Sequence, residues 1–230
     1  MKIGFVDDYL DNWHTNHYPF YIRLASGLYG ISAETAYAYA WRDHPGEGIS
    51  GDEWCKAQGI QRCNAYEELI EKSDAIMVMC ADNCLVHEEL AKKALMSGKP
   101  VYCDKTFAPT YEAAVRMFDL AEAYRTPVFS CSAQRFCMEL LCFQSQIQEN
   151  VKYCSSQGPG DMVNYSVHQF EMLETLMGVG AKRCMAQDIN GLKQIVYEYE
   201  DDRTCFFHQG DKLPFRLFHG PTGWACRKLP

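Results

Sequence analysis

The sequence predicts an α/β fold, in which a Rossmann-like doubly wound parallel sheet is followed by a small α+β domain with an open antiparallel sheet. Between residues 73 and 135, short apolar segments alternate with segments of helical periodicity. This β-α-β-α-β order produces a parallel sheet with right-handed crossovers. After residue 192, aromatic-rich segments separated by short turns replace the alternation, as in antiparallel sheets with one covered face. We expect a nucleotide-binding-type domain over residues 1–133 and a shortened substrate or oligomerisation domain over residues 134–230.

Several segments before residue 73 carry a recognisable pattern. The segment 19–30 has the residues typical of helix ends. Pro19 lies near its start and Gly30 just after its end, which are the positions that proline and glycine favour in helices. Tyrosine alternating with alanine marks another as a strand. In chain order we expect a strand over residues 2–6, a helix over 19–30, a strand over 33–41, a loop over 44–51 and short helices over 52–58 and 66–72.

The central run has the strongest pattern. Residues 74–80 (DAIMVMC) form a continuous apolar run, short enough for a strand buried on both faces. Asn83 and Thr110 are suited to cap the helices that follow. In order we expect a strand over 74–80, a helix over 84–98, a strand over 100–103, a helix over 111–125 and a strand over 127–131. Asp104 and Lys105 come just after the second of these strands, at the sheet edge where ligands bind in such folds.

The predicted second domain begins after Arg135. An apolar stripe along CMELLCFQSQIQENV indicates a helix that links the two domains. In order we expect this helix over 137–151, a loop over 153–160, a helix ending at Gly178, strands over 181–186, 192–200, 203–209 and 215–219, and a tail over 222–230. A small sheet with one apolar face needs covering, so we expect a homo-oligomer joined through this sheet.

Composition excludes several classes of partner. The chain has 230 residues, 47% hydrophobic and 23% charged, with a net charge of -8, and this charge argues against nucleic acid or an anionic membrane as partner. No apolar run reaches spanning length, and Met1 leads straight into a strand rather than into a signal peptide. We therefore expect a cytoplasmic protein that takes a small-molecule ligand.

The cysteines and histidines do not predict a metal site. The twelve cysteines include no Cys-x-x-Cys pair, so we expect reduced thiols rather than a metal cluster. His14 and His17 could share a helix face with Asp11, which is a conceivable metal corner. Half-buried or solvated histidines are the favoured interpretation of this pair.

The segment GKPVYCDKTFAPTYEAA, residues 98–114, resembles a motif of the Gfo/Idh/MocA family of sugar and cyclitol oxidoreductases. Lys105 stands in the place of the family lysine, with Asp104 where the family has glutamate and Thr106 where it has proline. Upstream, ADNCLVH is similar to the family turn that carries an asparagine and a histidine, here Asn83 and His87. The resemblance extends over roughly 60 residues and is far more specific than any single motif.

A second resemblance lies in the predicted second domain. His168 matches the family histidine that removes the substrate hydroxyl proton, while Asn164 holds the position of the family aspartate. The resemblance implies that His168 and Lys105 lie on opposite sides of one cleft and converge on one hydroxyl of a sugar or polyol. Asn164 would hold the imidazole by a hydrogen bond, and Arg135 would contact the substrate.

The family's phosphate-binding turn is altered in this chain. The register from Gly4 places Asp7, Tyr9 and Asn12 where a Gly-x-Gly-x-x-Gly fingerprint would stand. Asp7 and its neighbours Asp8 and Asp11 add negative charge where a pyrophosphate would lie, and like charges repel. We therefore expect NAD or NADP to bind weakly or not at all in the usual pose.

Other candidate cofactor contacts follow from the strand ends. Asp43 is the acidic residue nearest to the adenine ribose position, and Arg42 could instead face a 2′-phosphate. The candidate cofactor-binding residues are Asp7, Tyr9, Asn12, Asp43, Asn83 and Asp104.

Three functions stay open on the sequence. The first is an oxidoreductase that acts on a sugar or polyol with a nicotinamide cofactor, with Lys105 and His168 as acid–base partners. The second is a family member that has lost dinucleotide binding and serves as a small-ligand-binding or regulatory subunit. The third is a non-redox lyase or isomerase that uses the same two residues. Because Lys105 and His168 are retained, a catalytic function is favoured, and the oxidoreductase is the preferred one of the three.

Overall fold

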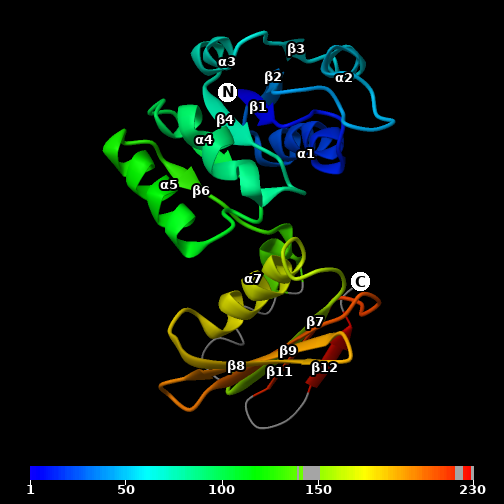
Figure 1. Ribbon diagram of the computed structural model, residues 1–230, viewed down its shortest axis with the longest axis vertical. Helices are drawn as coiled ribbons and strands as arrows, with labels where there is room; N and C mark the ends of the chain where they lie inside the picture. The colour runs from blue at the N-terminus through cyan, green and yellow to red at the C-terminus, as the bar shows by residue number, and fades with distance from the viewer. Residues whose placement is uncertain (139, 142–150, 221–224, 229–230) are drawn as a thin grey trace. The chain divides into compact units, whose positions relative to one another are not determined.

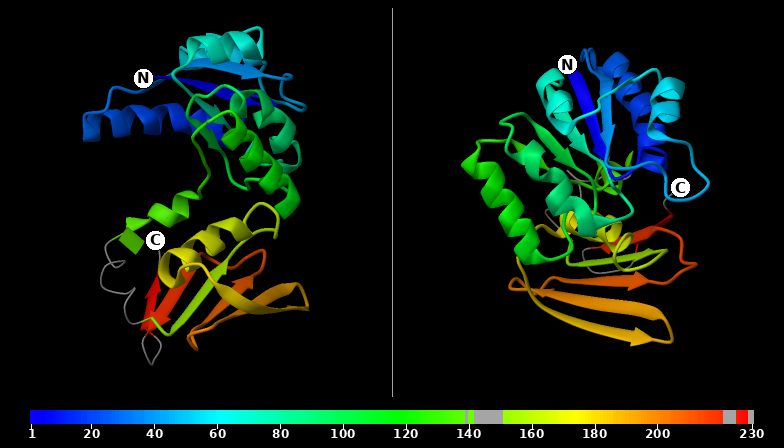
Figure 2. Two further views of the ribbon diagram at one scale, coloured as in Figure 1. Left: turned by 90° about the vertical axis from the view of Figure 1, so that its left-hand side faces the viewer. Right: turned by 45° about the horizontal axis from the view of Figure 1, so that its top comes forward.

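The computed structural model describes residues 1–138, 140–141, 151–220 and 225–228. The chain divides into two compact units, residues 1–130 and residues 131–230. The ribbon views show that each unit consists of a sheet with helices packed on it (Figure 1, Figure 2). Within the described residues, no helix is long and apolar enough to span a membrane. Each unit is built around its own sheet.

The sheet of the first unit has six parallel strands in the order β3-β2-β1-β4-β5-β6. The strands are β1 (Lys2–Asp7), β2 (Glu34–Ala40), β3 (Gln61–Arg62), β4 (Ala75–Val78), β5 (Val101–Cys103) and β6 (Val128–Phe129). The order reverses between β1 and β4, which are adjacent although β2 and β3 lie between them in the chain. This is the Rossmann-like doubly wound arrangement that the sequence predicts. The short strand β3 was not predicted.

Helices cover both faces of this sheet. They are α1 (Trp13–Tyr29), α2 (Gly51–Gln58), α3 (Tyr66–Lys72), the 3-10 turn η1 (Cys84–Val86), α4 (His87–Leu95) and α5 (Tyr111–Ala123). Phe5 and Val6, neighbours on β1, belong to different buried clusters, because successive side chains of a strand point to opposite faces. The sheet is therefore buried on two sides, as a parallel sheet requires.

Helix α1 differs from the prediction. It begins at Trp13, so Pro19 lies inside it and is buried. The start is set by a capping box, in which the Asn12 side chain accepts a hydrogen bond from Thr15 N and the Thr15 side chain accepts one from Asn12 N. Gly30 ends the helix in the left-handed conformation, as expected.

The second unit has a six-stranded sheet in the order β12-β11-β7-β10-β9-β8, with helix α7 packed on it. Its elements are η2 (Ala133–Phe136), β7 (Tyr153–Gly158), α7 (Ser166–Met177), β8 (Ala181–Ile189), β9 (Leu192–Tyr199), β10 (Thr204–Gln209), β11 (Arg216–Gly220) and β12 (Ala225–Lys228). The predicted α+β character is confirmed. The sheet is mixed, because β7 pairs with β10 in parallel while the other pairs are antiparallel.

Two predictions for this unit are wrong. Residues 153–160 are not a loop, because β7 is a central strand that pairs with β10 on one side and β11 on the other. Its small residues suit a close approach to α7: a Cβ added at Gly158 would lie 2.8 Å from the Gln169 side chain. The predicted tail contains β12. The predicted linking helix over 137–151 falls largely on residues 139 and 142–150, which lie outside the described residues.

Candidate functional site

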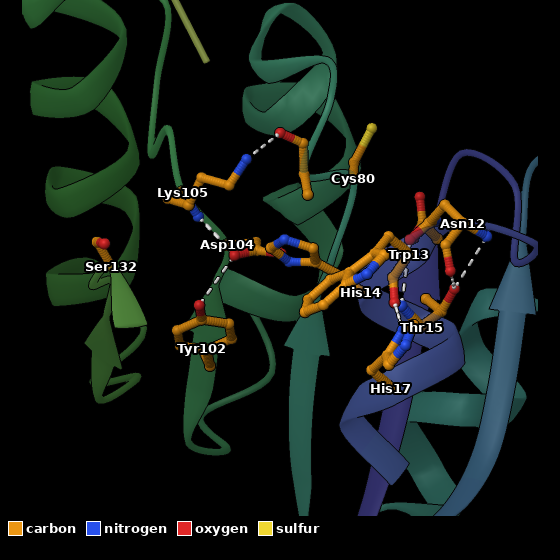
Figure 3. Close-up of polar contacts among 12 residues, drawn as sticks. Asn12, Trp13, His14, Thr15, His17, Cys80, Tyr102, Asp104, Lys105 and Ser132 are labelled. Carbon is orange, nitrogen blue, oxygen red and sulfur yellow. Dashed lines mark hydrogen bonds and ion pairs between the residues drawn. The ribbon is translucent and has the colours of Figure 1, made fainter. Parts of the chain in front are cut away.

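Lys105 lies just past the carboxyl end of β5 and is 6% exposed. Its Nζ donates a hydrogen bond to the carbonyl oxygen of Ala81 at 3.0 Å, on the segment that follows β4 (Figure 3). Asp104, the residue before Lys105, is tied to β4, because Asp104 N donates a hydrogen bond to Val78 O at 2.8 Å. The ends of β4 and β5 thus hold the lysine in one place. The Lys105–Thr106 peptide bond is cis.

Asp104 is fully buried and accepts three hydrogen bonds. Its Oδ1 accepts from the Tyr102 hydroxyl at 2.9 Å and from Lys105 N at 2.8 Å. Its Oδ2 lies 2.5 Å from Nδ1 of His14, on the first turn of α1. Figure 3 shows the imidazole beside the Asp104 carboxylate. A buried carboxylate needs such partners, and here they come from two parts of the chain that are far apart in sequence.

Asp7, at the end of β1, is 1% exposed. Its carboxylate accepts hydrogen bonds from Asp8 N at 2.7 Å and from the Asn12 side chain at 2.8 Å. Burial raises the pKa of Asp7 to about 7, outweighing these two hydrogen bonds, and nearby Asp104 contributes a smaller increase. Near neutral pH this carboxyl group is therefore protonated in a large fraction of molecules.

The other two acids of the turn are engaged by neighbours. Asp8 forms a two-point ion pair with the Arg42 guanidinium, with Nε–Oδ1 at 2.9 Å. Asp11 accepts from Ile49 N at 3.0 Å and from the Asn16 side chain at 3.0 Å. Hydrogen bonding by Asn16 contributes most to lowering the pKa of Asp11.

The remaining predicted cofactor contacts mainly hold the turns in shape. Asn12 caps α1 and bonds to Asp7. Asn83 caps η1, where its side chain accepts from Leu85 N at 3.3 Å. Asp43 accepts from Gly51 N at 2.7 Å and so closes the loop that leads into α2. Tyr9 packs its ring edge-on against His44, and burial raises the pKa of its hydroxyl.

These contacts decide how well the turn suits a dinucleotide. The expected repulsion from three free carboxylates is reduced, because Asp8 is paired, Asp11 is bonded to the chain, and a pKa of about 7 leaves Asp7 protonated in part of the molecules at neutral pH. The close backbone approach is not restored, because no glycine stands between residues 7 and 12 and the Asn12 cap occupies the Thr15 amide. The residues therefore do not fit a pyrophosphate seated on the turn after β1, and only the ends of β2, β4 and β5 are left as candidate contacts for a dinucleotide.

His168 lies on α7 in the second unit. Its Nδ1 is 2.6 Å from Oγ of Ser132, which is buried. Asn164 N and Nδ2 donate instead to the Asp161 carboxylate, at 2.9 and 3.3 Å. The polar group set against Nδ1 is therefore the Ser132 hydroxyl, rather than the Asn164 amide proposed from the sequence.

Arg135 is anchored to the same helix. Its guanidinium Nη1 lies 2.7 Å from Glu171 and 3.2 Å from Glu174, and Glu171 makes the larger contribution to raising the pKa of Arg135. The side chain keeps 36% of its surface exposed. An arginine held by two carboxylates has fewer N–H groups left to contact a sugar or polyol, which is the role that the resemblance implied for Arg135.

His87 is a structural residue. It is fully buried, and its two ring nitrogens lie 3.1 Å from Phe107 O and 2.9 Å from Cys80 O. It therefore ties α4 to the segments that follow β4 and β5.

The sequence missed the role of His14. It was weighed as a metal ligand or a solvated residue, yet it bonds Asp104, 90 positions away. Groups of three or more metal-ligating side chains are absent from the described part of the chain. The signal that could have found the pair is topological: residues just after β1 and just after β5 lie at the same edge of a parallel sheet.

Comparison with known proteins agrees with this architecture. Residues 31–130 match the GFO_IDH_MocA model, described as an oxidoreductase family with an NAD-binding Rossmann fold. An uncharacterized oxidoreductase of Schizosaccharomyces pombe is 42% identical over 185 residues, which cover 70% of this chain and 50% of that protein. The chain thus spans about half the length of this relative.

Solved structures share the fold of both units. UDP-N-acetylglucosamine 3-dehydrogenase from Acidithiobacillus ferrooxidans has a TM-score of 0.77 at 11% identity, over 96% of this chain and 74% of that one. Biliverdin reductase from Synechocystis, solved with biliverdin and NADP+, has a TM-score of 0.70 at 14% identity, over 97% of this chain and 78% of that one. The solved structures show the fold alone. The family-model match over residues 31–130, together with the Lys105 motif and the doubly wound sheet, shows that the first unit belongs to the Gfo/Idh/MocA family of oxidoreductases.

Proposed function

We propose that the chain is an oxidoreductase that acts on a hydroxyl group of a sugar or polyol with NAD or NADP. The observation that carries this proposal is the position of Lys105. The residue is 6% exposed, and its hydrogen bond to Ala81 O fixes it at the edge of the sheet where the carboxyl ends of the strands lie. A buried lysine is costly unless it is paired or used. Its position, just past the carboxyl end of β5, is where ligands of doubly wound folds bind.

The chemistry divides between cofactor and protein. A bound nicotinamide would supply the hydride acceptor or donor. Lys105 would orient the reacting hydroxyl by donating a hydrogen bond from Nζ. By the family resemblance, His168 is the residue expected to accept a hydroxyl proton. Ser132 would hold the His168 ring through Nδ1. Both assignments extend the family resemblance to this chain.

The nicotinamide dinucleotide would be held mainly at strand ends. Arg42, at the end of β2, keeps 54% of its side chain exposed while it pairs with Asp8. Asn83 follows β4 and is partly exposed, whereas Asp104, which follows β5, is fully buried and would position its neighbours rather than touch the dinucleotide. Without backbone contacts from a glycine-rich turn, we expect the affinity to be low.

A screen of turnover tests this function. Purified protein would be incubated with NAD+ or NADP+ and with a panel of polyols and sugars that includes myo-inositol, and absorbance of the reduced nicotinamide would be followed. The proposal expects turnover of at least one compound, with loss in Lys105→Met and His168→Asn. Turnover that persists unchanged in both variants would contradict the assigned roles, and no turnover with any compound would contradict the function.

The same proposal includes assembly of two or more copies through the sheet of the second unit. The residues of β8 are all exposed, among them Met185 at 61% and Ile189 at 51%. Exposed apolar side chains of this size support the proposal that another copy of the chain covers this sheet face in the assembled protein.

A further inference from the structure

Helix α1 has a second apolar stripe on the side that faces away from its sheet. The inner side packs on the first unit, where Ile22 contacts the buried cluster that contains Phe5 of β1 and Pro19 is buried. The outer side exposes large apolar side chains that, at about 100° per residue, lie within one band along the helix. Figure 2 shows α1 on the outside of the first unit. This band, the α1 stripe, consists of residues that are between 46% and 71% exposed: Trp13, Phe20, Tyr21, Leu24 and Leu28.

The sequence along this side has the spacing of a contact between helices. Steps of four and three residues alternate from Trp13 through His17, Phe20 and Leu24 to Gly27, which is the repeat of helices that pair side by side. The rings of Trp13 and His17 stack with centroids 4.2 Å apart, so the N-terminal half of the stripe is aromatic. A helix that is apolar on opposite sides is normally buried on both, whereas the described residues cover only one side of α1.

Gly27 lacks an explanation within one copy of the chain. It lies in the interior of α1, where glycine is less favourable than alanine. Its φ is not among the positive values of the described glycines, and a Cβ added at Gly27 would meet no described atom within 4 Å. The conformation and surroundings of Gly27 therefore permit alanine. A close approach by a second helix at this point accounts for the absence of a side chain.

We propose that a second copy of the chain covers the α1 stripe, with the two α1 helices packed antiparallel about a two-fold axis. In this arrangement the aromatic half of one stripe, with Trp13 and Phe20, lies against the aliphatic half of the other, with Gly27 and Leu28. Both copies then contribute the same surface, as a two-fold axis requires. The contact is separate from the sheet of the second unit, and it does not depend on the oxidoreductase function.

The charge of α1 favours a second copy over other partners. With histidine neutral, Arg23 is the only charged residue of this 17-residue helix, although the whole chain has a net charge of -8. Two α1 stripes can therefore meet without the repulsion expected between more acidic parts of the surface. A single arginine also supplies little attraction to an anionic membrane or to nucleic acid.

The area of the stripe sets the strength of the contact. An aromatic side chain can bury about 150–250 Å², and about half of each is exposed here, so the stripe supplies roughly 500 Å² per copy and the pair buries roughly 1,000 Å². This is the lower limit for a specific interface between proteins. We therefore expect a reversible dimer with a Kd of about 10–100 µM.

Sedimentation equilibrium tests this contact on the full chain carrying Met185→Asp, which blocks the proposed assembly through the sheet of the second unit. Between about 1 µM and about 500 µM protein, we expect a change from monomers to dimers. Leu24→Glu, added to this background, should raise the Kd about ten-fold or more, because it places a charge in an apolar contact. Arg23→Gln is the matched control, because it changes the net charge by the same amount at the neighbouring position off the stripe. Its Kd should stay within about 2-fold of the background.

Gly27→Ala separates packing between copies from the stability of one copy. Alanine should raise the urea midpoint of the dilute monomer, because it favours the helix, and should raise the Kd of the dimer several-fold, because its methyl group hinders close approach. Monomers at every concentration, a Kd that Leu24→Glu leaves unchanged, or a Gly27→Ala variant that dimerises as well as the background would overturn the proposal. Monomers that bind phosphatidylcholine vesicles, with loss of binding in Leu24→Glu, would assign the stripe to a membrane surface and would also overturn it.

Discussion

Replacing Asp7 by asparagine should stabilise the first unit at high pH and not at low pH. Burial raises the pKa of Asp7 from 3.8 to about 7. Below about pH 4 the carboxyl group is protonated in both the folded and unfolded states, so it contributes no pH dependence. Between about pH 4 and about pH 7, the unfolded state releases the proton while the folded state keeps it, so the folded state loses stability as pH rises. At about 1.4 kcal/mol per pKa unit, the full penalty above pH 7 is about 4 kcal/mol.

The substitution also has a cost. The asparagine amide has one oxygen where the carboxylate accepts at both, from Asp8 N at Oδ1 and from Asn12 Nδ2 at Oδ2, and the lost hydrogen bond costs about 1 kcal/mol. We therefore expect Asp7→Asn to be more stable than wild type by about 3 kcal/mol near pH 8, and slightly less stable near pH 4.

Urea unfolding followed by tryptophan fluorescence would measure this difference. Trp54 is 1% exposed and reports on the first unit. Asp11→Asn is the matched control, because the pKa of Asp11 is lowered and its removal should reduce stability at high pH. A stability difference for Asp7→Asn that does not change with pH would refute the reasoning.

Three further predictions concern the site, the core and the assembly. Lys105→Met should abolish turnover of any polyol or sugar substrate while leaving the melting temperature within a few degrees of wild type; substantial remaining turnover would contradict its role. His87→Ala should destabilise the protein by about 2–4 kcal/mol in urea, because the buried hydrogen bonding of the ring and the ring volume are lost; a neutral effect would argue against a structural role. Met185→Asp, on the exposed face of β8, should convert a wild-type oligomer to monomers in light scattering, and a monomeric wild type would refute the proposed interface.

Local sequence patterns predicted the first unit well. The apolar run at residues 74–80 contains strand β4, and Asn83 and Thr110 cap the helical segments that follow them. These signals are local, because a cap or a buried strand is defined by residues a few positions apart. Helix α1 was mispredicted at its start, since Pro19 outweighed the capping box at Asn12 in the analysis of the sequence.

Features that depend on distant residues were missed. Strand β7 has a serine- and glycine-rich sequence that indicates a loop, but β10 and β11 pair with it on both sides. The His14–Asp104 pair joins residues 90 positions apart. The charge of the turn after β1 was also misjudged, because the sequence does not show that Arg42 pairs with Asp8. Each of these depends on tertiary contacts that override composition.

Titration calorimetry of NADH and NADPH into the purified protein tests the central claim most directly. The account predicts saturable binding with a low affinity, a Kd of about 0.1–1 mM, because strand-end residues remain while the glycine contacts to pyrophosphate are missing. No saturable heat with either dinucleotide would contradict a cofactor site at this edge of the sheet. A micromolar or tighter Kd would contradict the conclusion that the capped turn after β1 limits binding.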